Sequence, residues 1–493
     1  MRTSAETPPP AVAALVADLA AALPAAALIT HEDGRRAFES DGLTAYRAMP
    51  AAVALPESVE QVREVIALCR RHGVPLVTRG AGTGLSGGAL PVEQGVVLGL
   101  SRLNRILEID PEACTARVQP GVRNLEISNA AAPHGLYYAP DPSSQIACTI
   151  GGNVAENSGG VHCLKYGLTV HNILELTVMT IEGETLTIGG PAPDSPGYDL
   201  LALMTGSEGM LGIVTEVLVK LLPRPPAVEV LLAAFDTVEE AANAVAAVIG
   251  AGIVPAGLEM MDRLATEVTE EFCHPGYPTD AAAILLCELD GERAEVTAAV
   301  SEVEALFRAG GASDVRIAAD AAARALFWQG RKAAFPAIGR IAPDYYCMDG
   351  TIPRRNLAEV LTAISALSKE YGLPIANVFH AGDGNLHPLI AYDASDDDQL
   401  HRAEACGAKI LELCVAAGGT ITGEHGVGIE KVDQMCSQFS DAELAQFHRL
   451  RAVFDPQGLL NPGKAVPTLS RCSEIGGMHV HGGAVPFPEL ERY

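Results

Sequence analysis

Two short motifs in the second half of the sequence bring together side chains that could bind a metal or move a proton. They are HAGDGNLH (380–387) and GEHG (423–426). The Gly-Asp-Gly-Asn segment between apolar runs predicts a hairpin with His380 and His387 close together at its base. Two imidazoles with the Glu424 carboxylate are a plausible ligand set for a divalent metal with open positions. A lone histidine would more often be a satisfied structural residue, but the two motifs together favour a metal or catalytic site.

A glycine-rich loop, RGAGTGLSGG (79–88), lies in the first quarter of the chain. It matches GxGxxG, but the Rossmann fingerprint requires a helix directly after the loop. The residues that follow contain Pro91 and then the strand-like run 95–98, so a Rossmann NAD site is disfavoured. A Walker A loop is absent as well, because Gly463-Lys464 is followed by Ala465.

A second glycine-rich stretch, within residues 142–160, has similar character. Successive backbone N–H groups in such turns can form a nest for an anion without any helix. A strained but empty turn is the alternative for the first loop. The presence of a second stretch favours a long, flat cofactor whose pyrophosphate lies against the main chain.

The elements that must position these motifs follow from periodicity. Residues 1–48 read as one helix and a connector, and 53–78 as a strand–helix–strand unit with Ser58 as N-cap and Gly73 as helix end. Short β-rich runs follow as far as a proline cluster at 223–226, the best domain boundary in the sequence. Alternating helices and strands then continue to about 465. The expected organisation is therefore α+β, with segments 1–48, 49–226, 227–465 and a tail, 466–493.

Composition limits the classes of partner. The chain has 34 basic and 61 acidic residues, a net charge of -27, which disfavours nucleic acid and anionic lipid as partners. Eleven scattered cysteines without a CxxC pair argue against a zinc ribbon, a disulfide scaffold or an iron–sulfur cluster, and for a reducing, cytoplasmic setting. The apolar stretch 11–29 is interrupted by Asp18 and Pro24, so it predicts a helix rather than a signal peptide, and no membrane span is expected.

Four ordered stretches resemble the vanillyl-alcohol-oxidase type of flavoprotein, also called the p-cresol-methylhydroxylase (PCMH) type. They are RGAGTGLSGG (79–88), PDPSSQIACTIGGNVAENSGG (140–160), GSEGMLGIVTEV (206–217) and FDPQGLLNPGK (454–464). The resemblance implies FAD bound by a two-subdomain domain (49–226), under an α+β cap domain (227–465). The FAD-binding residues that it implies are Arg79, Gly80, Ala81, Gly82, Thr83, Gly84, Leu85, Ser86, Pro142, Ser143, Ser144, Thr149, Gly151, Gly152, Asn153, Glu156, Asn157, Gly159, Gly160, Glu208, Gly212, Ile213 and Asn461. Thr83–Ser86 contains neither His nor Cys, so the FAD should be non-covalent.

The histidine motifs resemble those of the D-2-hydroxy-acid dehydrogenase branch of this family, in particular the D subunits of bacterial glycolate oxidases. The resemblance implies a divalent metal, often zinc, on His380, His387 and Glu424, with His425 as base. It also makes Arg331 the residue that binds the substrate carboxylate, although a surface charge is the alternative for Arg331. This set suits oxidation of a hydroxy acid, because a metal acidifies the hydroxyl, an imidazole takes the proton and flavin takes the hydride.

The resemblance leads to expectations about substrate and partners. Cys347 and Leu389 stand where members acting on long diacids carry polar groups, which favours a small acid, either glycolate or D-lactate. A second flavin-type subunit and an iron–sulfur subunit would carry electrons to the membrane quinone pool, and would hold the protein peripherally at the membrane. His479 and His481 in the tail could dock a partner or bind a second metal. A D-lactate dehydrogenase acting alone, a non-catalytic scaffold subunit and an oxidase using oxygen directly remain as alternatives.

Overall fold

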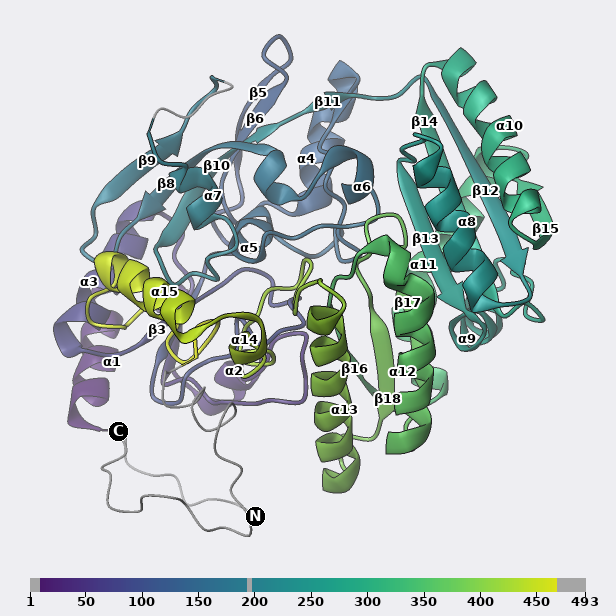
Figure 1. Ribbon diagram of the computed structural model, residues 1–493. Coiled ribbons are helices and arrows are strands. Elements are labelled where there is room, and N and C mark those ends of the chain that lie inside the picture. The colour runs from purple at the N-terminus through teal and green to yellow at the C-terminus, as the bar shows by residue number, and fades with distance from the viewer. Residues whose placement is uncertain (1–8, 193–196, 468–493) are drawn as a thin grey trace.

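The computed structural model describes residues 9–192 and 197–467 of the 493 residues. Three sheets carry the fold, and Figure 1 shows the first two on one side of the molecule and the third on the other. The tail that contains His479 and His481 lies outside the described residues, so the expectations about it stay predictions.

The first sheet is four-stranded, in the order β1-β2-β4-β3, with strands Leu28–Ile29, Ala52–Ala54, Val96–Gly99 and Leu76–Arg79. Helices α1 (Pro10–Ala22) and α3 (Val59–His72) pack against it. As expected, the Ser58 side chain accepts from the Gln61 N–H, and Gly73 ends α3 with φ of 63°. The expectation of one helix and a connector before residue 48 missed β1 and α2 (Glu32–Arg36), since elements of two and five residues leave no periodicity.

The second sheet is five-stranded and antiparallel, in the order β5-β6-β10-β8-β9. Its strands are Ile106–Asp110, Thr115–Val118, Ile213–Lys220, Ile173–Met179 and Thr185–Gly189. The helices of this region are α4 (Asn124–Ala131), η2 (Ala132–His134), α5 (Ile150–Glu156), α6 (Cys163–Tyr166), η3 (Thr169–His171) and α7 (Leu200–Met204). Strand β11 (Leu222–Pro223) pairs with β7 (Leu136–Tyr137), and the rest of the proline cluster then leads into the third sheet.

The third sheet is seven-stranded, in the order β15-β12-β14-β13-β17-β18-β16. The strands are Ala312–Ile317, Ala227–Phe235, Ala283–Gly291, Gly257–Asp262, Ile375–Phe379, Pro388–Tyr392 and Asp344–Cys347. One face packs on α8 (Val238–Gly250), α10 (Arg293–Ala309), α12 (Leu357–Tyr371) and α13 (Asp397–Ala416). The other face packs on α9 (Arg263–Cys273) and α11 (Ala321–Ala337). Helices on both faces explain why β12 is buried almost throughout.

After α13 the chain passes through α14 (Met435–Gln438) and α15 (Asp441–Phe454) back to the first sheet, as Figure 1 shows in yellow. There Leu76 donates its N–H to Leu459 and accepts from the Asn461 N–H. The last described segment therefore belongs physically to the N-terminal side of the molecule. No helix within the described ranges is long and apolar enough to cross a membrane.

Candidate active site

A cavity of about 360 Å³ opens between the two glycine-rich stretches and the cap domain. Most of the residues predicted to bind FAD line it: Gly80, Ala81, Gly82, Thr83, Gly84, Leu85, Pro142, Ser143, Ser144, Thr149, Gly151, Gly152, Asn153, Glu156, Glu208 and Gly212. His387, Glu424 and His425 line the same cavity. The structure thus brings the glycine loops and the histidine motifs to one site, although they are more than 200 residues apart in the sequence.

Seven of the residues predicted to bind FAD do not line the cavity: Arg79, Ser86, Asn157, Gly159, Gly160, Ile213 and Asn461. Two of them hold the loops that do line it. Arg79 donates to the Ser40 carbonyl, and buried Asn461 donates to the carbonyls of Gly88 and Glu208. Arg79 and Asn461 therefore support the cofactor loop from behind, a role that the order of motifs could not separate from direct contact.

Small residues are needed in the cavity wall for two different reasons. A Cβ on Gly80 would lie 2.2 Å from the Thr149 hydroxyl, so this glycine lets the two glycine-rich stretches pack against each other. Gly84 has no atom within 4 Å of where its Cβ would be, so it borders open space. A long cofactor can therefore lie against the backbone at this point, and the cavity suits FAD.

The cap domain also lines the cavity through four residues that the sequence analysis did not single out. Lys332, Phe335 and Pro336 of α11 and Tyr345 of β16 reach it. The periodicity of a helix cannot show which of its faces meets another domain.

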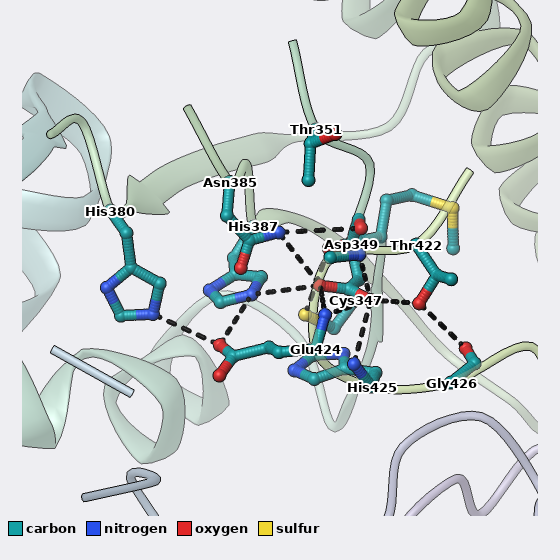
Figure 2. A network of polar contacts seen from close by, with 12 residues as sticks. Cys347, Asp349, Thr351, His380, Asn385, His387, Thr422, Glu424, His425 and Gly426 are labelled. Carbon is teal, nitrogen blue, oxygen red and sulfur yellow. Dashed lines mark hydrogen bonds and ion pairs between the residues drawn. The ribbon is translucent and has the colours of Figure 1, made fainter. Parts of the chain in front are cut away.

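The predicted hairpin places His380 directly after β17 and His387 directly before β18. Their ring centroids are 5.1 Å apart. Glu424 Oε1 lies between them, 3.1 Å from His380 Nε2 and 3.3 Å from His387 Nε2 (Figure 2). The three side chains offer ligand atoms within 4.8 Å of one another, and all three are at least nine-tenths buried. His387 Nδ1 has no hydrogen-bond partner among the described residues. This donor set fits a divalent cation.

Glu259 and Arg331 support His380 from behind. His380 Nδ1 lies 2.8 Å from Glu259 Oε1, and Arg331 Nε donates to Glu259 Oε2 at 2.8 Å. Arg331 is only 1% exposed, so the alternative of a surface charge is wrong. It does not line the main cavity, but its Nη1 has no hydrogen-bond partner among the described residues. Burial opposes the charge of Glu259, yet His380 and Arg331 hold the pKa of its carboxyl below the usual value.

Asp349 is the centre of the polar network drawn in Figure 2. Its carboxylate accepts backbone N–H groups of Gly423 at 3.0 Å, Glu424 at 3.2 Å and His425 at 2.9 Å. It also accepts from the Thr422 hydroxyl at 2.6 Å and the Asn385 amide at 2.9 Å, and Lys431 Nζ lies 3.4 Å away. Asp349 therefore fixes the loop that carries Glu424 and His425. Sequence reasoning missed Asp349, because no local motif marks it; the structure places it two residues after β16 (Asp344–Cys347).

His425 lies on the cavity side of the metal-ligand set. Its ring stacks on that of His387, with centroids 4.8 Å apart and planes 5° from parallel. Its Nδ1 has no hydrogen-bond partner among the described residues. Burial lowers the pKa of His425 to about 4, so the ring is neutral near pH 7 and can accept a proton.

The expectation that Cys347 and Leu389 border the substrate is wrong. The two residues pair across β16 and β18 and are 3% and 0% exposed, inside the core between the sheet and helices α9 and α11. Cys347 shares a strand face with Tyr345, but of the two only Tyr345 reaches the cavity. The case for a small substrate therefore needs other support.

Comparisons with known proteins identify the class. Residues 50–189 match an FAD binding domain, and residues 224–465 match the C-terminal domain of FAD linked oxidases. The chain belongs to the FAD-linked oxidase family and is an FAD-dependent oxidoreductase. Both the resemblance and the α+β fold class expected from the sequence are confirmed.

Comparison with individual relatives gives more detail than the family match. The chain is 63% identical over 456 residues to glycolate oxidase subunit GlcD of Escherichia coli K12, covering 92% of this chain and 91% of the relative. It is 41% identical to GlcD of Bacillus subtilis, covering 87% and 92%, and 33% identical to a D-lactate dehydrogenase of Anaerostipes hadrus, covering 87% and 92%. Among solved structures, p-cresol methylhydroxylase superposes with a TM-score of 0.79 at 18% identity, covering 93% of this chain and 98% of that one. The last likeness concerns the fold alone.

We expect acid denaturation to release the FAD into solution. The first glycine loop has no His or Cys side chain, and the cysteine in the cavity wall, Cys148, has its thiol within 3.5 Å of the Asn153 amide. Precipitation of the holoprotein with trichloroacetic acid should leave a yellow supernatant and a colourless pellet. Flavin that stays with the pellet would contradict non-covalent binding, and the same assay on Cys148→Ser would then show whether this thiol is the point of attachment.

Proposed function

We propose that this protein oxidises a small 2-hydroxy acid, converting glycolate to glyoxylate and, as the second substrate, D-lactate to pyruvate. FAD is the electron acceptor. His380, His387 and Glu424 hold a divalent metal, for which zinc is the first candidate. The observation that carries the proposal is the position of Glu424 Oε1 between two histidines in the wall of the flavin cavity.

The relatives support the choice of substrate. Relatives from two organisms are named glycolate oxidase subunits, at 63% and 41% identity, whereas the D-lactate dehydrogenase is 33% identical. Glycolate is therefore the preferred substrate. D-Lactate differs from it by one methyl group, a difference worth roughly 1–3 kcal/mol in a fitted pocket.

The residues of this chain have the following roles in the proposed reaction. When bound, FAD supplies a two-electron acceptor, and the metal lowers the pKa of a hydroxyl that it coordinates. His425, which is neutral and faces the cavity, accepts the hydroxyl proton. Glu259 accepts a hydrogen bond from His380 Nδ1, which leaves Nε2 as the ligand atom. Arg331 Nη1, which has no hydrogen-bond partner within the part of the chain that the structure describes, is the donor assigned to the substrate carboxylate.

Replacing Arg331 with lysine should raise KM for glycolate by roughly 10- to 100-fold, with a smaller change in kcat. Lysine keeps the charge beside Glu259 but loses the planar pair of donors, and a hydrogen bond to a charged group is worth about 1.5–3 kcal/mol. Steady-state kinetics should be compared with those of Lys332→Met, since Lys332 is the rival cation in the cavity wall. If Lys332→Met raises KM more than Arg331→Lys, the carboxylate lies on Lys332 instead.

We also propose that electrons leave this chain to partner proteins, namely a second flavin-type subunit and an iron–sulfur subunit that serve quinone at the membrane. The word subunit in the names of the glycolate oxidase relatives supports this arrangement. The alternatives are a D-lactate dehydrogenase acting alone, a scaffold without its own activity, and an oxidase that uses oxygen. Hydrogen peroxide formed at the full rate of substrate oxidation would contradict the partner route and favour the oxidase.

The deciding experiment is anaerobic mixing of the FAD-loaded protein with glycolate, D-lactate and D-2-hydroxyglutarate in a stopped-flow spectrophotometer. Glycolate should bleach the flavin band fastest, chelator treatment should abolish the bleaching, and added Zn²⁺ should restore it. Bleaching that survives complete removal of metal would exclude the metal's role. Absence of bleaching by any of the acids would favour the scaffold alternative.

A further inference from the structure

A second cavity, of about 220 Å³, lies on another side of the same metal-ligand set. It is formed between α6, η3 and the loops beside them on the flavin side, and the turn of the His380–His387 hairpin on the cap side. His380 and Glu424 form part of its wall, together with Cys163, Asp383 and Asn385. His387 and His425 do not line it, whereas they do line the main cavity. The ligand set thus separates two spaces.

The two oxygens of Glu424 point in different directions. Oε1 contacts the two histidines, as described above. Oε2 lies 2.6 Å from where a Cβ on Gly159 would be, and Cys163 Sγ lies 3.0 Å from the same point. The second oxygen and the thiol therefore both border the space beside Gly159, and Glu424 and Cys163 both line the second cavity. A larger residue than glycine at position 159 would close this gap.

The second cavity leads from the surface to the buried ligands. His171, in its wall, is exposed, and Cys163, Leu168 and Asp383 are partly exposed. His380, at the inner end, is 4% exposed. An ion that reaches the ligands this way does not have to cross the space in which FAD lies.

The charge of the wall suits a cation and not the substrate. Asp383 and Glu424 contribute carboxylates, and Asp141 and Glu259 also act electrostatically on Cys163. Among the described residues that line this cavity none is Lys or Arg, whereas Lys332 lines the main one. A cleft with carboxylates of one sign raises the local concentration of counter-ions and repels an anionic hydroxy acid.

We infer that the second cavity is the path by which the divalent metal enters and leaves, with the Asp383 carboxylate and the Cys163 thiol as transient ligands on the way. This inference rests on the proposed metal site. It assigns a function to residues outside the ligand set. The metal passes through the second cavity, whereas flavin and substrate use the main one.

The test measures the rates at which Zn²⁺ alone binds to and leaves the FAD-loaded, metal-free protein, in stopped flow with a zinc indicator. Asp383→Asn keeps an acceptor for the Asn385 N–H but removes the charge. It should slow zinc uptake about 10-fold at low ionic strength, and less at high ionic strength. The control is Asp110→Asn, which changes a carboxylate that accepts backbone N–H groups in the distant β5–β6 turn.

A variant that fills the second cavity distinguishes an entry path for the metal from a part of the metal-binding site. Leu168→Trp should slow uptake and release of Zn²⁺ by the same factor, so that the Kd stays unchanged. Leu107→Trp, on an exposed leucine of β5 that is 38% exposed, is the matched control. Retention of the flavin spectrum reports on folding in every variant.

The outcomes are distinct. If wild-type protein takes up Zn²⁺ tightly and both test variants load as fast as their controls, the path is elsewhere and only this inference fails. If Leu168→Trp weakens the equilibrium affinity without slowing uptake, the second cavity belongs to the binding site and is not a path. If wild-type protein binds no Zn²⁺, the metal site of the proposed function fails and the inference falls with it.

Discussion

His425→Asn should lower the rate of flavin bleaching by glycolate about 10²- to 10⁴-fold, while FAD and metal stay bound. His425 faces the main cavity, and burial keeps its ring neutral near pH 7. The only hydrogen bond of this residue to the Asp349 network among those described runs through its backbone N–H, which asparagine keeps. The loss should therefore fall on proton removal and leave the loop in place.

The measurement is anaerobic stopped flow at saturating glycolate, with FAD and zinc contents determined on the same samples. His401→Asn, on the exposed side of α13, is the matched control and should react like wild type. If glycolate bleaches the flavin of His425→Asn as fast as that of wild type, His425 is not the base. Equal turnover of variant and wild type in a complex with partner subunits would point to a scaffold.

Asp349→Asn should weaken metal affinity by about 10- to 100-fold, the usual effect of losing a residue that orients metal ligands. It should also lower the free energy of unfolding by about 1–3 kcal/mol for each buried donor left without an acceptor. The carboxylate accepts from three successive backbone N–H groups as well as from Thr422 and Asn385, and an amide cannot accept from all of these donors. Asparagine also removes the negative charge beside buried Lys431.

Zinc titration and urea unfolding of the holoprotein report on the two effects separately. Asp455→Asn is the control, because Asp455 is buried and accepts the N–H groups of Leu459 and Leu460 far from the histidines. The control should lose stability but keep the zinc affinity of wild type. If Asp349→Asn lowers the stability but keeps the zinc affinity of wild type, Asp349 maintains the fold without positioning the metal ligands.

The difference between what the sequence predicted and what it missed follows from the range of the interactions. The hairpin at 380–387 was predictable because its turn chemistry is local, and the structure places His380 and His387 as the spacing requires. Asp349 was not predictable, since it meets the 422–425 loop across more than 70 residues of sequence. Its role arises only when the cap domain folds.

The same reasoning explains the wrong expectation for Cys347 and the surface-charge alternative for Arg331. Cys347 is on the strand face of Tyr345, and period-two alternation cannot show how far along a strand the cavity extends. Arg331 and Lys332 are neighbours in the sequence, yet one is buried against Glu259 and the other borders the cavity. Charge alone does not distinguish them, because a helix turns by about 100° between successive residues.

The return of residues 455–464 to the first sheet has a consequence for biosynthesis. Asn461 donates to the carbonyls of Gly88 and Glu208, and Lys464 Nζ donates to the Gly88 carbonyl at 3.1 Å. A ribosome makes the glycine-rich loop early, but the segment that supports this loop emerges only after the intervening residues 89–454 have been translated. Nascent chains therefore cannot complete the flavin pocket during most of translation, and cofactor capture becomes a late step that prematurely terminated chains never reach.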